Sequence, residues 1–482
     1  METRGILHMD GTRANPFEEL DRSGITRFHW KVMFISGMGF FTDAYDLFII
    51  GVALTLLKPI WHLSTLEVSV LGSSSLLAAA VGAMIFGRVA DVLGRKRIYG
   101  LEVLVLAAGA IASAFAPSFW WLVVFRFILG VGIGGDYPVS ATIMSEYSGT
   151  KVRGMLISLV FAMQGVGLIV GPLVAIALLA AGLNHELVWR IMLGLGAIPA
   201  LSVFYMRRNL NETPRFAALA GANEDASHAA NRALGRHDDP SPNEGPRRKH
   251  DRLFDELSVY LKDPVMLRWL IGASLAWFLL DVAYYGNTLS SPLVVKAINP
   301  SATLITNTTI TLAIFAIAAF PGYLVAAIAM DRLGRKIIQG LGFLLMGCAF
   351  AAMALLPGGS QAVVPFILLY GISYFFAEFG PNTTTFVYPA EIFPARIRTT
   401  SHGITATAGK LGAVVGTFAF PLLMAHYGLP GAMGTVAGVA ILGLLVTWFL
   451  LPEPKGQSLE EISRDDLLRI HQADQAAARS SH

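Results

Sequence analysis

The chain has 482 residues, of which 54% are hydrophobic and only 14% are charged. Soluble domains usually carry about 25% charged residues, so this composition and a mean hydropathy of +0.58 exclude an ordinary soluble protein. The single cysteine, Cys348, excludes an intramolecular disulfide framework and argues against a metal site. The net charge of +3 points to no particular partner, and we expect neither a cofactor nor a nucleic acid.

The apolar residues are gathered in long blocks. A helix that crosses a bilayer needs about 20 mostly apolar residues, and the sequence contains twelve such blocks, which predict an all-α membrane protein. The predicted transmembrane helices are 31–57, 66–90, 98–115, 119–144, 155–182, 187–206, 266–295, 304–329, 337–356, 361–388, 401–426 and 430–451.

These blocks divide the chain into five parts. Residues 1–30 are charged and lack the apolar core of a cleaved signal peptide, so we expect an N-terminal segment on the cytoplasmic side. Two six-helix bundles follow, at 31–206 and 266–451. The linker between them, 207–265, is polar and proline-rich, a composition that cannot bury a core. A mostly polar tail, 452–482, ends the chain.

Basic residues lie in alternate loops. They are Arg95, Lys96, Arg97, Lys151, Arg153, Arg332, Arg335, Lys336, Arg396 and Arg398. The intervening short loops contribute only Lys58 and Lys296, with Arg190 at a helix border. Because basic residues mark cytoplasmic loops, we expect a multi-pass protein of the cell membrane with both termini and the linker in the cytoplasm.

The two halves of the chain repeat each other. The motif Asp91-Val-Leu-Gly-Arg-Lys96 returns 240 residues later as Asp331-Arg-Leu-Gly-Arg-Lys336. Glu146 and Arg153 return 245 residues later as Glu391 and Arg398, at the same helix count. Two motifs repeated in order predict parallel repeats related by an axis along the membrane normal.

The doubled loop resembles that of the major facilitator superfamily, in particular its sugar-porter-like branch. The stretch from Arg126 to Gly134, the motif Glu212-Thr-Pro-Arg215 and the motif Pro452-Glu-Pro-Lys-Gly456 support the resemblance, which covers about residues 30–460. It implies the major facilitator fold, with twelve helices in two pseudo-symmetric bundles, alternating access, and a substrate site between the halves.

Ionisable residues inside the apolar blocks are costly and usually serve the movement of substrates or protons. In the first block, Asp43 and Asp46 lie three residues apart on one helix face. Neighbouring carboxylates favour proton binding by one of them, which suits a proton carrier. The alternative is a structural pair with Arg126 or a backbone N–H, and the sequence does not choose between Asp43 and Asp46.

Two further blocks combine a carboxylate with aromatic residues. Asp136 and Tyr137 precede the helix-breaking Pro138, which suits proton exchange, whereas the alternative is a helix-packing motif. Trp277, Asp281 and Tyr285 share one helix face, which favours a site inside the bundle over simple packing.

Lys410, flanked by glycines within the eleventh block, is a candidate to hold an anion; the alternatives are snorkelling and a pair with a carboxylate. Gln164 and Asn382 are polar residues in apolar helices and are weak evidence when taken alone. Together these side chains suit a small oxygen-rich anion. An aspartate that accepts a substrate O–H favours protonated phosphate over sulfate, which has no proton to give.

Longer stretches are similar to the proton-coupled inorganic phosphate symporters. They are Gly39–Phe48, Gly134–Glu146, Trp277–Asp281, Phe379–Phe386 and Ser401–Lys410. The resemblance implies phosphate contacts at Tyr137, Gln164, Trp277, Asp281, Tyr285, Asn382 and Lys410. It implies proton coupling at Asp43, Asp46, Asp136 and Asp281, with Glu102 a weaker candidate. The repeated loops suggest a cytoplasmic gate of Asp91, Arg95, Glu146, Arg153, Asp331, Arg335, Glu391 and Arg398, with exposed pairs Glu146–Arg153 and Glu391–Arg398.

One position departs from the family pattern, because Glu378 stands where a neutral asparagine is expected. An extra carboxylate near the site would repel a dianion unless it is protonated or paired; the alternative is that it faces a neighbouring helix or the external vestibule. The leading hypothesis is a phosphate–proton symporter that acts as a monomer. The alternatives are a carrier of an organic acid, an aromatic acid or a sugar, and, further off, a nutrient sensor. No motif favours an enzyme.

Overall fold

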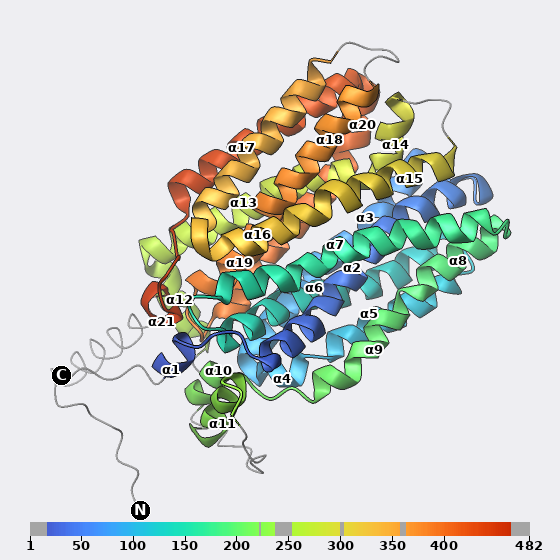
Figure 1. Ribbon diagram of the computed structural model, residues 1–482. Coiled ribbons are helices and arrows are strands. Elements are labelled where there is room, and N and C mark those ends of the chain that lie inside the picture. Colours follow the sequence, from blue (N-terminus) through green and yellow to red (C-terminus); the bar gives the residue numbers. More distant parts are fainter. Residues whose placement is uncertain (1–16, 221–222, 237–252, 299–302, 357–362, 464–482) are drawn as a thin grey trace, which may run out of the picture.

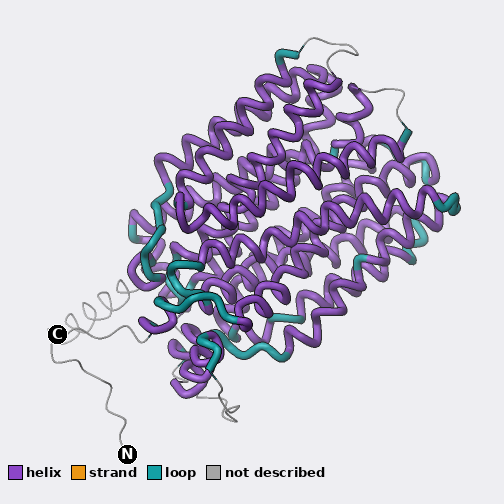
Figure 2. Tube along the Cα trace, in the orientation of Figure 1, coloured by secondary structure: helices purple, strands orange, loops and turns teal. Residues whose placement is uncertain are grey.

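The computed structural model describes residues 17–220, 223–236, 253–298, 303–356 and 363–463, and this part of the chain is helical apart from its connections (Figure 2). The first half contains α1 (Glu18–Asp21), α2 (Arg27–Ile60), α3 (Thr65–Leu93), α4 (Arg95–Ile98), α5 (Leu101–Ala114), α6 (Phe119–Tyr147), α7 (Arg153–Ala180), α8 (His185–Leu195) and α9 (Ala197–Arg208). The short helices α10 (Pro214–Leu219), α11 (Asn223–Ala233) and α12 (Leu253–Lys262) follow.

The second half contains α13 (Pro264–Leu289), α14 (Ser291–Ile298), α15 (Leu304–Ile314), α16 (Phe320–Leu333), α17 (Arg335–Ala354), α18 (Val363–Ala377), α19 (Thr383–Ile392), α20 (Arg398–Leu450) and α21 (Leu459–Ile462). Two π-helical turns, η1 (Phe315–Ala319) and η3 (Glu378–Asn382), join α15 to α16 and α18 to α19.

Within the described residues, eleven helices are long and apolar enough to cross a membrane. One of them, α20, has 53 residues and would be about 80 Å long if straight, more than twice the thickness of a bilayer core. Its backbone breaks at Gly428, whose φ of 67° is open to glycine at little cost. The helix therefore supplies two spans, so the predicted all-α membrane fold with twelve transmembrane segments is confirmed.

Helix ends follow local sequence signals. Ser64 and Glu67 form a capping box at the start of α3, and the Asp263 carboxylate caps α13 just before Pro264.

Large apolar side chains such as those of Phe127, Ile328 and Leu442 are exposed on the outside of the bundle. Lipid is the solvent that suits such a surface, whereas most of the charged side chains inside the spans are buried.

The two halves lie side by side along their helices (Figure 1). Helix α3 of the first half packs along α20 of the second, and α7 packs along α16. The contact of α3 with α20 is close because Gly87 faces Gly403, where an added Cβ on Gly87 would lie 3.0 Å from the Gly403 Cα. These crossings place residues of both halves around one buried centre.

One end of the bundle carries both repeated loops, and we call it the charged end: it comprises Asp91, Arg95, Asp331 and Arg335 with their neighbours. The short helices α1, α10, α11, α12 and α21 gather at this end (Figure 1). The segment that the sequence assigns to the linker therefore contains helices α10, α11 and α12. Residues 237–252 of that segment lie outside the described part of the chain.

Candidate functional site

Helices α13 and α20 approach closely along a row of glycines in α20. A Cβ added to Gly412 or Gly416 would lie 2.2 Å from a carbonyl oxygen of α13, so only glycine fits at these crossings. Gly409 likewise lies against the Trp277 ring. This packing sets Trp277, Asp281 and Tyr285 of α13 beside Lys410 of α20, as their positions on one helix face predict.

The Lys410 ammonium group binds phenols from both halves. Its Nζ lies 2.9 Å from the Tyr137 hydroxyl and 2.5 Å from the Tyr285 hydroxyl. It also lies 4.2 Å from the centre of the Tyr137 ring, a cation–π contact. The Lys410 side chain is buried, so it does not snorkel to water. A cation held by neutral partners inside the protein is well suited to attract an anion.

A chain of hydrogen bonds continues from Tyr137 across the interface. Tyr137 donates to Asp43 Oδ2 over 2.5 Å, and Gln164 Nε2 donates to the same oxygen over 3.2 Å. The Tyr323 hydroxyl donates to Gln164 Oε1 over 3.1 Å, and Asn382 Nδ2 donates to the Tyr323 oxygen over 2.8 Å. Side chains from both halves thus form one buried polar network.

Asp281 stands beside this network, with the Trp277 indole as its hydrogen-bonding neighbour. Its side chain is only 1% exposed, and neither carboxylate oxygen makes a well-formed hydrogen bond within the described residues. Lys410 attracts it electrostatically and Asp43 repels it. Buried polar atoms are almost always hydrogen-bonded, so such a carboxylate next to a cation marks a place where a ligand or a proton can bind.

The predicted contact residues Tyr137, Gln164, Trp277, Asp281, Tyr285, Asn382 and Lys410 are therefore brought together, with Asp43 among them. Trp277 takes part through its ring, whose centre lies 5.9 Å from that of Tyr137. The site offers N–H and O–H donors around one cation and two carboxylates that can accept or carry protons. No cluster of three or more His, Cys, Asp or Glu side chains suitable for a metal ion occurs in the described part of the chain.

Asp46 lies apart from this network. It forms a two-pronged ion pair with Arg126, with distances of 2.5 and 2.7 Å, and Ser75 completes the contact. This is the structural alternative considered for Asp46. Of the two carboxylates in α2, only Asp43 faces the candidate site.

Asp136 and Glu102 share a second buried arginine. Arg207 Nη1 lies 2.8 Å from Asp136 Oδ1 and 3.0 Å from Glu102 Oε1. Ser140 also donates to Asp136, and the Arg207 guanidinium stacks on the Tyr99 ring at 4.4 Å. The sequence predicts that Arg207 begins the linker, whereas this residue lies in the last turn of α9 and is fully buried.

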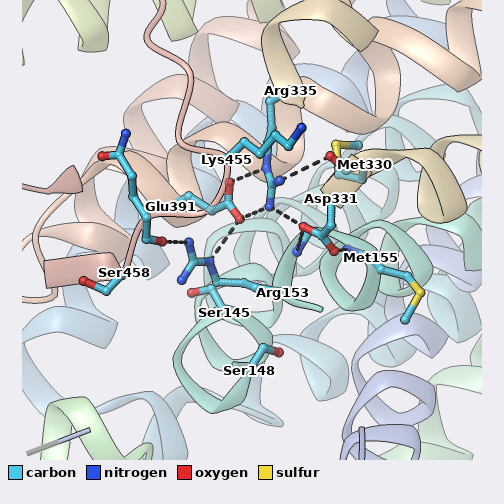
Figure 3. A network of polar contacts seen from close by, with 12 residues as sticks. Ser145, Ser148, Arg153, Met155, Met330, Asp331, Arg335, Glu391, Lys455 and Ser458 are labelled. Atoms are coloured by element: carbon cyan, nitrogen blue, oxygen red, sulfur yellow. Dashed lines mark hydrogen bonds and ion pairs between the residues drawn. The ribbon is translucent and has the colours of Figure 1, made fainter. Parts of the chain in front are cut away.

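At the charged end, carboxylates of one half bind arginines of the other. Figure 3 shows Glu391 between Arg153 of the first half, at 3.0 Å, and Arg335 of its own half, at 2.6 Å. Glu146 in turn binds Arg398 of the second half at 2.9 Å and Arg95 at 3.2 Å. The expected pairs Glu146–Arg153 and Glu391–Arg398 are wrong, because each acid pairs with the equivalent arginine of the opposite repeat.

The expected exposure of these pairs is also wrong. The paired side chains of Arg153, Glu391, Arg398 and Glu146 are at most 1% exposed. Breaking one partner of a buried ion pair costs roughly 3–5 kcal/mol, far above the 0–1 kcal/mol of an exposed pair. At the charged end, this network therefore joins the two halves through buried ion pairs.

The repeated aspartates join the halves through backbone groups. Asp331 accepts N–H bonds from Gly154 and Met155 at the start of α7, at 3.1 and 2.8 Å (Figure 3). Asp91 accepts the equivalent bonds from Thr399 and Thr400 at the start of α20, at 3.3 and 2.6 Å. Carboxylates favour helix N-termini, so each repeated loop caps a helix of the other half.

Two glutamates outside the predicted set repeat this pattern. Glu212 accepts the backbone N–H groups of Arg95 and Lys96, and Glu453 accepts those of Arg335 and Lys336. Glu212 lies in the motif Glu212-Thr-Pro-Arg215 and Glu453 in the motif Pro452-Glu-Pro-Lys-Gly456. Their equivalent positions after each six-helix block are the signal that could have identified this role.

Arg215 ties three distant segments together beside this network. It binds Asp21 of α1 at 2.6 Å, Glu460 of α21 at 2.7 Å and the Glu146 carbonyl at 2.8 Å. Burial raises the pKa of Glu460, but the Arg215 guanidinium outweighs burial and holds that pKa below its ordinary value of 4.5. For Asp21 burial wins, and its pKa is raised.

Tyr323 and Glu378 complete the candidate site although no predicted contact falls on them. Tyr323 bridges Gln164 and Asn382, and Glu378 Oε2 accepts from Asn382 Nδ2 over 2.5 Å. A lone tyrosine in an apolar block carries no distinctive pattern, so the sequence offers no signal for Tyr323. Glu378 stands where the family resemblance leads us to expect asparagine, and it faces the network rather than an external vestibule.

The family model described as "Sugar (and other) transporter" matches residues 23–465. The chain is 38% identical to inorganic phosphate transporter 1-11 of Oryza sativa subsp. japonica, covering 95% of this chain and 91% of the relative. It is 37% identical to low affinity inorganic phosphate transporter 1 of Petunia hybrida, covering 93% and 95%.

Solved structures show the same fold. A structure of the major facilitator proton:xylose symporter XylE bound to 6-bromo-6-deoxy-D-glucose matches with a TM-score of 0.76 at 20% identity, covering 90% of this chain and 98% of that one. The inward-open xylose transporter XylE from E. coli matches with a TM-score of 0.65 at 19% identity, covering 90% and 99%. The family resemblance inferred from the motifs is confirmed, as is the expectation of a transporter rather than an enzyme. The chain is a multi-pass membrane protein that belongs to the sugar (and other) transporter family of the major facilitator superfamily.

Proposed function

We propose that this protein carries inorganic phosphate together with protons across the cell membrane. The observation that carries the proposal is the buried network around Lys410, in which a cation and several O–H and N–H donors face two carboxylates, Asp43 and Asp281. Relatives with 37–38% identity over more than nine-tenths of the chain are named inorganic phosphate transporters.

Phosphate fits this set of groups better than sulfate does. At neutral pH phosphate both accepts and donates hydrogen bonds, so Lys410, Tyr137, Gln164 and Asn382 would serve its oxygens while an aspartate accepts its O–H. Asp281 lies next to the cation, and neither of its oxygens makes a well-formed hydrogen bond within the described residues. A protonated Asp281 keeps one acceptor oxygen, and sulfate has no O–H to donate to it. An unpaired buried acceptor disfavours the wrong polar ligand.

Protons make the binding of an anion possible here. Asp281 and Asp43 repel an incoming anion while both are ionised, and binding of protons removes that repulsion. We infer that protons from outside neutralise these carboxylates, that phosphate then binds Lys410, and that the halves rock about this centre. Loss of the Asp281 proton on the cytoplasmic side restores the repulsion and releases phosphate.

Asp136 and Glu102 would extend the proton route. They share Arg207 in a buried cluster, and Asp136 directly precedes Tyr137 of the candidate site in α6. A proton arriving at Asp136 weakens its pairing with Arg207, which offers a step between the site and the cytoplasm.

The buried ion pairs and caps at the charged end would form the cytoplasmic gate, with Asp91, Arg95, Glu146, Arg153, Asp331, Arg335, Glu391 and Arg398 as its members. The basic loops support a cytoplasmic charged end, with both termini on that side. All the network side chains come from one chain, which supports action as a monomer.

The test is uptake by purified protein in proteoliposomes. Radiolabelled phosphate should enter, and unlabelled phosphate should compete, whereas sulfate, benzoate and glucose in tenfold excess should not. Competition by benzoate or glucose would instead favour a carrier of aromatic acids or sugars. Absence of phosphate uptake by well-folded protein would remove the proposed substrate.

A further inference from the structure

Glu378 is a carboxylate buried in the second half at the first residue of the π-helical turn η3. Its side chain is not exposed to solvent, and Gly322 of α16 packs against its Cβ. Oε2 accepts a hydrogen bond from Asn382 Nδ2, and the Tyr284 and Tyr323 phenols are the other hydrogen-bonding neighbours of this carboxylate. Oε1 makes no well-formed hydrogen bond within the described residues. The irregular turn brings Glu378 and Asn382, four residues apart, into direct contact.

The groups that face Glu378 are neutral. They are the phenols of Tyr284 and Tyr285 from α13, Tyr323 from α16 and Tyr374 from α18, together with the Asn382 amide. No arginine, lysine or histidine forms an ion pair with Glu378 in the part of the chain that the structure describes. An ionised carboxylate would therefore be unpaired at membrane depth, which costs several kcal/mol.

Glu378 is connected to the candidate phosphate site. Four hydrogen bonds lead from it to Asp43, through Asn382, Tyr323 and Gln164, with lengths of 2.5, 2.8, 3.1 and 3.2 Å. Asn382 is the critical link because its amide has two hydrogens, and Glu378 and Tyr323 accept both of them. In this arrangement Asn382 has no N–H left to donate to a substrate.

We propose that Glu378 binds one proton with each phosphate carried and releases it to the opposite side, as a coupling site in the second half. The inference depends on the proposed phosphate–proton symport. A proton on Glu378 removes its charge and weakens its hold on Asn382, so that the amide can turn its N–H toward phosphate. When water reaches the site from the other side, Glu378 loses its proton. The ionised carboxylate again accepts the Asn382 N–H and repels the anion.

The carboxylate exchanges only a proton with water, so no other bond forms or breaks. A sodium ion in place of the proton is the main rival, because an unpaired buried carboxylate can also hold a cation.

The experiment compares wild type with Glu378→Gln, which keeps the shape and the acceptor oxygen but cannot exchange a proton. In proteoliposomes, the reversal potential of phosphate flux under imposed pH and phosphate gradients gives the number of protons carried per phosphate. We expect Glu378→Gln to carry one proton fewer while still moving phosphate. Glu186→Gln, at a partly exposed pair on the other end of the bundle, is the matched control and should behave as wild type.

Calorimetry extends the test to variants that bind but do not transport. Phosphate binding titrated in buffers of different ionisation enthalpy reports the protons taken up, and this uptake should fall in Glu378→Gln and persist in Glu378→Asp. Glu378→Asn replaces Glu378→Gln if the latter does not fold. An unchanged proton count, or stimulation by sodium in place of protons, would overturn the inference. A wild type that neither binds nor moves phosphate would instead defeat the proposed function itself.

Discussion

The Arg153 Nε of the first half lies 3.0 Å from Glu391 Oε1 of the second. The reciprocal contact, between Arg398 and Glu146, has a length of 2.9 Å. In each repeat the arginine thus forms an ion pair with the glutamate of the other repeat. Opening the charged end requires both cross-half pairs to separate, so the duplication itself produces a symmetric lock.

The first prediction concerns this lock. Glu391→Gln should destabilise the closed charged end by roughly 3–5 kcal/mol, because Arg153 and Arg335 then lose their shared buried carboxylate. In a Cys348→Ser background, spin labels at the exposed positions Lys151 and Arg332 should report a longer distance between the halves by electron paramagnetic resonance. Glu186→Gln should leave the distance unchanged. An unchanged distance in Glu391→Gln would contradict the claim that the ion pairs of Glu391 hold the halves together at the charged end.

The second prediction separates the two carboxylates of α2. Asp46→Asn should lower the free energy of unfolding by about 3–5 kcal/mol, because it leaves the buried Arg126 without its ionised partner. Asp43→Asn should change thermal stability much less and abolish pH-driven uptake. Melting curves and uptake measured on both variants check this. Equal loss of stability in the two would show that Asp43 is structural as well.

The third prediction concerns Lys410. Lys410→Gln should weaken phosphate binding by roughly 10- to 150-fold, the equivalent of about 1.5–3 kcal/mol for a hydrogen bond to a charged group. Lys410→Arg should retain only part of the wild-type phosphate affinity, because a planar guanidinium cannot occupy the same place between the Tyr137 and Tyr285 hydroxyls. Isothermal titration calorimetry measures both. Wild-type affinity in Lys410→Gln would exclude Lys410 from the site.

The fourth prediction is a pH dependence at the charged end. The pKa of Glu460 is below its ordinary value of 4.5 because the Arg215 guanidinium outweighs the effect of burial. A depressed carboxylate pKa stabilises the fold above the ordinary value, and this stability is lost as the pH falls through the lowered pKa. Glu460→Gln should therefore lower the melting temperature by a constant amount from pH 5.5 to 7.5, and the difference should shrink below pH 4.5. A difference that grows on acidification would contradict this.

Sequence patterns could predict most of the fold. Hydrophobic blocks predict most helix boundaries to within a few residues, and they separate the eleventh segment from the twelfth near Gly428, where the backbone of α20 breaks. The repeated motifs predict which residues gather at the charged end. They cannot predict that each glutamate pairs with the arginine of the other repeat. The same acid and base occur in both halves, so the sequence alone does not show whether a pair forms within one half or between the two.

The sequence predicts which residues form the candidate site better than it predicts the hydrogen bonds and ion pairs between them. Lys410, Trp277 and Asp281 stand out because charges and aromatic residues on one face of an apolar helix are costly to place there. Tyr323 and Arg207 do not stand out, since one is a lone phenol and the other ends a helix beside a second arginine. Only the three-dimensional packing shows that Tyr323 bridges the halves and that Arg207 is buried between Asp136 and Glu102.

The coupling of phosphate to protons is tested most directly by uptake into proteoliposomes with an imposed pH gradient. With the interior alkaline, labelled phosphate should accumulate above its external concentration, and a protonophore should collapse that accumulation. Asp281→Asn should carry fewer protons per phosphate and therefore reach a lower accumulation at the same gradient. Phosphate that merely equilibrates, at the same rate with and without the gradient, would contradict proton coupling.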